Sequence, residues 1–256
     1  MIQCDKVYVQ LDRKEILKDV SLEARKGEIC VIIGRNGSGK TTLLRAMDGL
    51  ISLREGTIRL EDKSLQEYSA RDIAKKAAYL PQHPAAPRIT VEELVSFGRA
   101  PYGLSPGRQG RKDRQIVEEA LADSGLDAFR NQWVSSLSGG ERQLAYITLA
   151  NVQQTDFMLM DEPTAGLDAR KKRYLFDLLT RKKEEGKGII LSLHDLEDAC
   201  LLADHLVVLE QGRKVFDGSP EGFMDSTVPM EVFGKQPVRV QDEAFNAFTV
   251  FRDVRN

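Results

Sequence analysis

The chain has 256 residues, of which 41% are hydrophobic and 30% are charged, and its formal net charge is −2. This balance is typical of a globular protein and argues against a surface that binds nucleic acid or another polyanion. The three cysteines are far apart and form no CxxC pair, so they support neither a disulfide framework nor a zinc site. No apolar run approaches the ~20 residues needed to cross a bilayer.

Segments with strand and helix patterns alternate along the chain. Strands are predicted at 6–11, 29–34, 77–82, 157–160 and 188–195, with a strand edge and turn at 55–65 and a hairpin at 205–218. Helices are predicted at 69–77, 91–100, 113–125, 169–185 and 195–204, with two more that begin at Gly139 and at Ser219-Pro220. This alternation implies a mostly parallel sheet covered on both faces.

One proline-rich stretch interrupts the alternation. Residues 80–90, LPQHPAAPRIT, contain three prolines, which exclude a regular helix or a central strand there. The break predicts a helical insert over about 90–140. Beyond about residue 226 the pattern is too weak to predict an element.

Residues 34–41, GRNGSGKT, fit GxxxxGK[ST] between a predicted strand and a predicted helix. Glycines let successive N–H groups point inward around an anion, and the helix N-terminus adds its dipole. Lys40 would place a charge at the β- and γ-phosphates, and the Thr41 hydroxyl is a ligand for Mg²⁺. The alternative, a glycine-rich turn without a function, leaves the strand–loop–helix order unexplained. The predicted nucleotide contacts here are Gly34, Arg35, Asn36, Gly37, Ser38, Gly39, Lys40, Thr41 and Thr42.

Two adjacent acids follow the buried-type run Phe157–Met160. An acid at the carboxyl end of a strand lies where ligands bind in open α/β sheets. Asp161 would hold Mg²⁺ through its water, and Glu162 would polarise an attacking water. The alternative for such a pair is an ordinary polar loop, which a preceding phosphate loop makes less favoured.

With the phosphate loop, the segment Leu137–Glu141, LSGGE, resembles the signature of the ATP-binding cassette (ABC) ATPases. Gln82 matches the family's Q-loop glutamine, PTAGLD at 163–168 matches its D-loop, and His194 matches its switch histidine. The alternative for His194, a satisfied core histidine, is set aside because of this match. The resemblance covers residues 1 to about 220. It implies nucleotide contacts at Ser138, Gly139, Gly140, Glu141 and Asp168, metal contacts at Thr41, Gln82 and Asp161, and catalytic roles for Lys40, Gln82, Glu162 and His194.

The resemblance also implies the fold and its division. We expect an α/β, P-loop NTPase-type sheet covered by helices, with an antiparallel N-terminal β subdomain and a helical insert subdomain. Residues 1–256 would form a single domain. Its nucleotide-binding core would span 1–89 and 141–225, with the helical subdomain at about 90–140 and a short C-terminal extension at 226–256.

The chain has one phosphate loop and one signature segment. In the family, the Ser138-type segment of one subunit closes on the γ-phosphate that the other subunit holds. The expected assembly is therefore a homodimer that sandwiches two MgATP and works with two permease chains and, indirectly, a substrate-binding protein, without nucleic acid. The implied location is the cytoplasmic face of the membrane.

One position departs from the family. An aromatic residue usually stacks on adenine, and alignment places Leu11 there. Tyr8 is close but off register, because a slip in register turns a side chain away. How adenine is recognised is therefore left open.

Two segments, 77–104 and 218–240, resemble the ATPases of importers for iron-siderophores, haem and cobalamin. The predicted function is therefore ATP hydrolysis that powers import of a metal chelate. The alternatives are the ATPase of an exporter or of another importer, and a soluble ABC ATPase that acts on ribosomes or DNA. A nucleotide kinase would leave Leu137–Glu141 unexplained.

Overall fold

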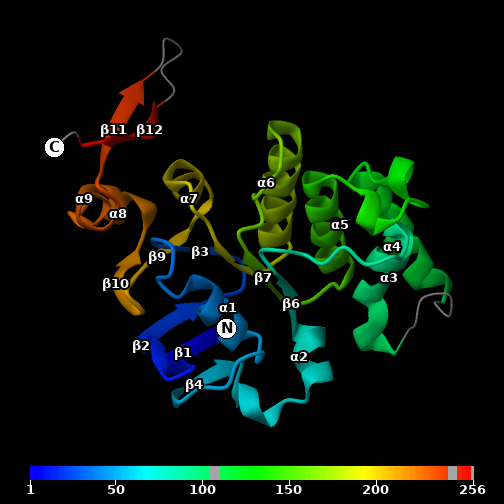
Figure 1. The fold of residues 1–256 in the computed structure, drawn as a ribbon, viewed down its shortest axis with the longest axis horizontal. Coiled ribbons are helices and arrows are strands. Elements are labelled where there is room, and N and C mark those ends of the chain that lie inside the picture. Colours follow the sequence, from blue (N-terminus) through cyan, green and yellow to red (C-terminus); the bar gives the residue numbers. More distant parts are fainter. Residues whose placement is uncertain (104–109, 242–246, 255–256) are drawn as a thin grey trace.

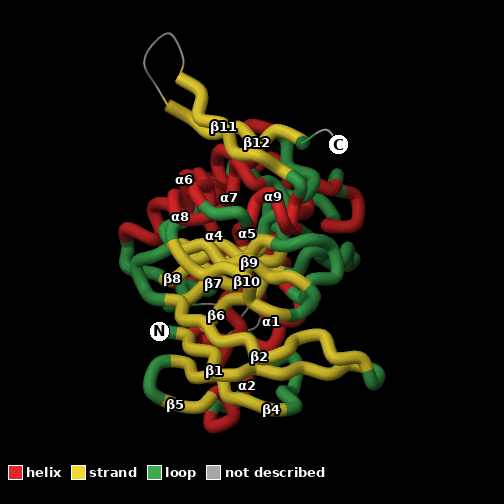
Figure 2. Tube along the Cα trace, turned by 90° about the vertical axis from the view of Figure 1, so that its left-hand side faces the viewer, coloured by secondary structure: helices red, strands yellow, loops and turns green. Residues whose placement is uncertain are grey.

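The structure, a computed structural model, describes residues 1–103, 110–241 and 247–254. Figure 2 shows its layers from bottom to top: an antiparallel sheet, a six-stranded sheet, a layer of helices, and a two-stranded hairpin beyond them. This arrangement confirms the predicted α/β class with an antiparallel N-terminal sheet. Within the described part of the chain, no helix combines the length and the apolar character that a membrane span requires.

The six-stranded sheet positions the candidate site. In spatial order its strands are β10 (Arg213–Gly218), β9 (His205–Glu210), β3 (Ile29–Ile33), β8 (Gly188–Ser192), β7 (Phe157–Asp161) and β6 (Ala77–Leu80). All neighbours pair in parallel except β10, which is antiparallel to β9. The segments that follow β3, β6, β7 and β8 therefore leave the sheet at the same edge.

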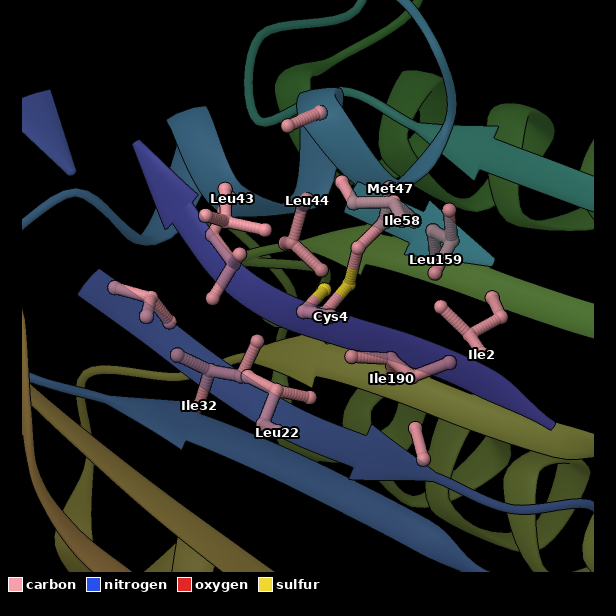
Figure 3. Close-up of a cluster of buried hydrophobic side chains, with 14 of the residues drawn as sticks. Ile2, Cys4, Leu22, Ile32, Leu43, Leu44, Met47, Ile58, Leu159 and Ile190 are labelled. Carbon is pink, nitrogen blue, oxygen red and sulfur yellow. The ribbon is translucent and has the colours of Figure 1, made fainter. Parts of the chain in front are cut away.

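Both faces of this sheet are covered, as the sequence predicted. Every residue of β3, β7 and β8 is buried. Along β3, Cys30 and Ile32 pack toward the N-terminal sheet, where Figure 3 shows Ile32 beside other apolar side chains. Val31 packs into the opposite cluster. The helices that contribute to that second cluster are α5 (Gly139–Val152), α6 (Ala169–Glu184), α7 (Leu196–Leu202), α8 (Pro220–Asp225) and α9 (Val228–Phe233).

Helix α1 (Lys40–Met47) lies between the two sheets (Figure 1). A helix of eight residues is marginal in isolation, so packing must stabilise it. Leu43, Leu44 and Met47 are fully buried, and at about 2 kcal/mol for each buried apolar side chain they contribute about 6 kcal/mol. This anchorage holds the start of α1 at the edge where β3 ends.

The N-terminal sheet contains a long strand that the sequence did not predict. Its strands in order are β2 (Lys14–Ala24), β1 (Ile2–Leu11), β4 (Glu55–Leu60) and β5 (Lys63–Ser64). Charged residues obscure the pattern at the start of β2, and regular alternation begins only at Val20. The turn between β1 and β2 places Asp12 and Arg13 at φ 46° and 66°, without the glycine that usually marks such a turn.

A group of helices at the right of Figure 1 has its own apolar cluster. The helices of this group are α3 (Val91–Ser96), the 3-10 helices η2 (Phe97–Tyr102), η3 (Asp127–Phe129) and η4 (Val134–Ser136), and α4 (Arg111–Asp123). The cluster extends into α5 through Leu144 and Ala145. Gly125 follows α4 at φ 70°, the left-handed conformation typical of a glycine at the C′ position. The remaining helices are η1 (Leu65–Glu67) and α2 (Ala70–Lys76).

The residues beyond 226 form elements that the sequence did not predict. α9 leads into β11 (Lys235–Gln241), which pairs with β12 (Ala247–Asp253) as a hairpin that projects from the body in Figure 1. Phe251 anchors β12, since its ring packs on Phe223 and its N–H donates to Glu197.

Candidate active site

The phosphate loop follows β3 and ends at the first residue of α1. A Cβ added to Gly34 would lie 2.2 Å from the carbonyl oxygen of Leu209 and 2.6 Å from Ser38 Oγ. Gly39 is the N-cap of α1 at φ 107°, and a Cβ there would lie 2.7 Å from Leu17 Cδ2. These two glycines are therefore required by close packing as well as by backbone conformation.

The packing at Gly34 leads to a stability prediction. Gly34→Ala is expected to lower the free energy of unfolding by more than about 2 kcal/mol, because the contact at Leu209 is with backbone. Gly37→Ala is the matched control: Gly37 has φ 78° but open space around its Cβ position, so about 1 kcal/mol is expected. Thermal unfolding of the two variants should rank them in this order, and equal losses would contradict the packing argument.

Lys40 lies at the base of the loop. Its Nζ donates to the carbonyl oxygen of Gly34 at 2.9 Å, and the residue is 6% exposed. Burial lowers the pKa of Lys40, while the charges of Glu162 and Asp161 act to raise it. Because Gly39 has no side chain to cap α1, the first N–H groups of the helix remain available to an anion beside this ammonium.

A buried serine organises the two acids after β7. Ser192 Oγ, at the end of β8, donates to Asp161 Oδ1 at 2.7 Å and accepts from the backbone N–H of Glu162 at 2.9 Å. Asp161 is fully buried, and its Oδ2 has no hydrogen-bond partner within the described residues. The sequence interpretation missed Ser192, although a serine in an otherwise apolar buried strand was a signal for it.

Glu162 lies between two side chains from neighbouring strand ends. Its carboxylate accepts from Gln82 Nε2 through one oxygen and contacts His194 Nε2 through the other. Its backbone has φ 48°, a conformation that is uncommon for a non-glycine residue. The His194 side chain is 48% exposed, so the alternative of a satisfied core histidine is wrong.

These groups line one cavity of about 470 Å³. Its lining residues are Lys14, Ile16, Asn36, Gly37, Ser38, Gly39, Lys40, Thr41, Thr42, Gln82, Glu162 and His194. The structure thus brings together most of the phosphate-loop residues and all four predicted catalytic side chains, which are Lys40, Gln82, Glu162 and His194. Lys14 and Ile16 of β2 were not predicted to belong to it. Asp161 lies buried behind the cavity, and Gly34 and Arg35 do not line it.

The signature residues lie elsewhere on the surface. Ser138 is the exposed N-cap of α5: its Oγ accepts from the N–H of Glu141 at 3.3 Å, and its own N–H donates to Glu141 Oε2 at 2.8 Å. Gly140 packs against Gly166, where a Cβ would lie 2.6 Å from the carbonyl oxygen. Asp168 is the N-cap of α6 and is also exposed. Ser138, Gly139, Gly140, Glu141 and Asp168 do not line the cavity.

Leu11 occupies the position where the family usually has an aromatic residue that stacks on adenine, and it does not line the cavity. Leu11 is 41% exposed beside the turn that joins β1 to β2. Tyr8 pairs with Glu55 on β4 and, like Leu11, does not line the cavity.

Comparison with known sequences gives a consistent picture. The protein family described as "ABC transporter" matches residues 17–165. The chain is 38% identical over 236 residues to the petrobactin import ATP-binding protein FpuC of Bacillus anthracis, covering 91% of this chain and 87% of the relative. It is 33% identical over 250 residues to the hemin import ATP-binding protein HmuV of Rhodococcus jostii, covering 97% of this chain and 85% of the relative.

Two solved structures illustrate the likeness in fold. An inward-facing ABC transporter described as of metal-chelate type superposes with a TM-score of 0.83 at 22% identity, covering 99% of this chain and 97% of that one. A dimeric bacterial ABC transporter cassette superposes with a TM-score of 0.76 at 24% identity, covering 86% of this chain and 99% of that one. The first likeness extends over residues beyond 226, and the second leaves a larger part of this chain unmatched.

Proposed function

Because this chain belongs to the ATP-binding cassette (ABC) transporter family and is an ATPase, we propose that it powers the import of a metal chelate such as an iron-siderophore, haem or cobalamin. The observation that carries this proposal is the similarity along almost the whole chain to ATP-binding proteins of petrobactin and hemin import. The fold likeness to the metal-chelate type transporter supports the proposal further, since that likeness covers 99% of this chain and so includes the C-terminal hairpin. We also propose that the protein lies at the cytoplasmic face of a membrane and acts with two permease chains and, indirectly, a substrate-binding protein.

The functional unit proposed is a homodimer. Ser138 and Gly139 are exposed and do not line the cavity that holds Lys40. A second copy related by a two-fold axis would bring its own Ser138, at a helix N-terminus, to the phosphates in the first copy's cavity. The dimeric form of a cassette with this fold is consistent with such an arrangement.

The residues present fit Mg²⁺. Asp161 Oδ2 is buried without a hydrogen-bond partner in the described part of the chain, an arrangement that costs free energy unless a cation or water satisfies it. The residues that would hold the ion are Thr41, Gln82 and Asp161, which supply the oxygen ligands that Mg²⁺ prefers. Bound there with ATP, Mg²⁺ would neutralise phosphate charge.

The structure locates the side chains of this chain to which we assign the steps of ATP hydrolysis. Glu162 would orient and polarise the attacking water, since its carboxylate lies at the cavity wall between Gln82 and His194. Lys40, His194 and the partner copy's signature segment would stabilise the charge that develops on the γ-phosphate. Loss of that phosphate would open the dimer and move the permeases.

Transport and partner assays test the proposal together. In a strain that lacks this protein, uptake of a ⁵⁵Fe-loaded siderophore, of haem and of radiolabelled cobalamin should be measured separately. We expect loss of one of these activities and its recovery with the wild-type chain. Tagged protein extracted from membranes in mild detergent should bring two permease chains with it. Unchanged uptake of all three chelates would overturn the proposed cargo class, and recovery of the protein free of any membrane partner would overturn the transport role.

A further inference from the structure

Two walls of the cavity are chemically different. Gln82, Glu162 and His194 come from the carboxyl ends of strands in the six-stranded sheet, on the wall where the γ-phosphate reacts in the proposed function. Lys14 and Ile16 come from β2 of the N-terminal sheet. With the phosphates held along the loop and the terminal phosphate at Glu162, the wall formed by β2 is the one left for the nucleoside.

This wall is held firmly against the phosphate loop. A Cβ added to Gly39 would meet Leu17 Cδ2 at 2.7 Å, so β2 and the loop are in direct contact. The backbone N–H of Lys18 donates to the carbonyl oxygen of Gly212 at 2.8 Å, and the N–H of Gly212 donates to the carbonyl oxygen of Ser38 at 3.1 Å. The backbone of β2, from which Lys14 and Ile16 project, therefore has a fixed place relative to the phosphate loop.

The wall formed by Lys14 and Ile16 of β2 presents one cation and no aromatic ring to a nucleobase. None of the described residues that line the cavity is a phenylalanine, tyrosine or tryptophan, and the imidazole of His194 belongs to the opposite wall. Ile16 is the only apolar side chain that β2 contributes to this lining, and Lys14 is its only charged one. Lys14 is exposed, and the described part of the chain provides no ion pair for it. Its ammonium is therefore free to contact a base.

The chemistry of an ammonium bears on which base it accepts. Lysine has hydrogen-bond donors and no acceptor. Guanine presents two adjacent acceptors, O6 and N7, whereas adenine presents N7 beside an amino group that is itself a donor. We propose that Lys14 contacts the nucleobase and that this site accepts GTP as well as ATP. The inference rests on the proposed function, because it requires a nucleoside triphosphate in this cavity.

Steady-state hydrolysis of ATP and of GTP by the wild-type chain, Lys14→Gln and Lys18→Gln tests the assignment. The wild-type kcat/KM for GTP is expected to lie within about threefold of that for ATP. Glutamine offers a donor and an acceptor, which match N7 and N6 of adenine. Lys14→Gln should therefore shift the GTP-to-ATP ratio of kcat/KM toward ATP by about tenfold, through KM and with kcat unchanged, a factor equivalent to about 1.4 kcal/mol. Lys18→Gln, on the same strand but outside the cavity lining, should leave the ratio unchanged.

The outcomes separate this inference from the proposed function. If the wild-type chain hydrolyses ATP but uses GTP more than about thirtyfold less efficiently, the inference is wrong and the ATPase role stands. An unchanged GTP-to-ATP ratio in Lys14→Gln, or an equal shift in Lys18→Gln, would also overturn the role of Lys14. Binding of both nucleotides to the Glu162→Gln chain provides a second readout that does not depend on turnover, and it should show the same shift in ratio with Lys14→Gln.

Discussion

Replacing Glu162 with glutamine is expected to lower the rate of ATP hydrolysis by about 10²–10⁴-fold, the usual contribution of a general base. Glutamine keeps the size of the side chain and can still contact Gln82 and His194, but it carries no negative charge to polarise the water. ATP binding depends on the loop and on Lys40, so it should be retained. Phosphate release measures the rate, and size-exclusion chromatography with MgATP should show a stable dimer, because the bridging phosphate is no longer removed.

The matched control is Glu184→Gln, which neutralises an exposed glutamate near the end of α6. It should hydrolyse ATP at the wild-type rate. Normal turnover in both variants would refute the role proposed for Glu162. Slow turnover combined with loss of ATP binding would mean that Glu162 serves the architecture of the cavity instead of the chemical step.

The parts of the site predicted from sequence are those fixed by local order. Strand, glycine loop and helix follow one another at Lys40, and an acid follows a buried strand at Glu162. Parallel strands then bring such segments to one edge, which is why Gln82 and His194 join the same cavity. The prediction that Ser138 acts on the nucleotide of another subunit depended on the family resemblance. The sequence around Ser138 does not indicate whether this segment contacts a nucleotide bound by its own chain or by a partner.

Features that depend on pairing between distant segments could not be predicted in the same way. Ser192 joins Asp161 and Glu162 only because β7 and β8 pair in the register that sets Asp161 opposite Ser192. Lys14 reaches the cavity because β2 packs on the phosphate loop, and β2 itself was not predicted. Each of these placements is a consequence of tertiary contacts that periodicity and spacing do not report.

The C-terminal hairpin was missed for a related reason. β11 carries Lys235, Pro237 and Arg239 among its seven residues, which weakens any strand pattern. Its stability comes from its partner strand and from contacts of Phe251 with residues more than twenty positions away. A two-stranded hairpin is marginal alone, so packing on α7 and α8 decides whether it forms.

Ser138→Arg is expected to abolish hydrolysis while leaving the binding of ATP to the single chain unchanged. Ser138 lies outside the cavity, so the new side chain would not contact a nucleotide held by its own chain. It would instead obstruct the approach of α5 to the partner's phosphates, and loss of such contacts costs about 10²–10³-fold in rate. Ser69→Arg is the control, because Ser69 is also an N-cap and its loss should cost a similar ~1 kcal/mol of stability. Fluorescent-nucleotide binding and phosphate release separate the two effects.

Mixing two inactive chains tests the same geometry more strictly. Lys40→Ala should fail to bind ATP, and Ser138→Arg should bind it without turnover. In a mixed dimer, one cavity combines the intact Lys40 of one chain with the intact Ser138 of the other. Random pairing of equal amounts makes half of the dimers mixed, each with one complete site of two, so about a quarter of wild-type activity should return. Each chain would have to remain inactive alone. Turnover by Ser138→Arg as a strict monomer, or a mixture as inactive as its components, would mean that one chain does not complete the site of another.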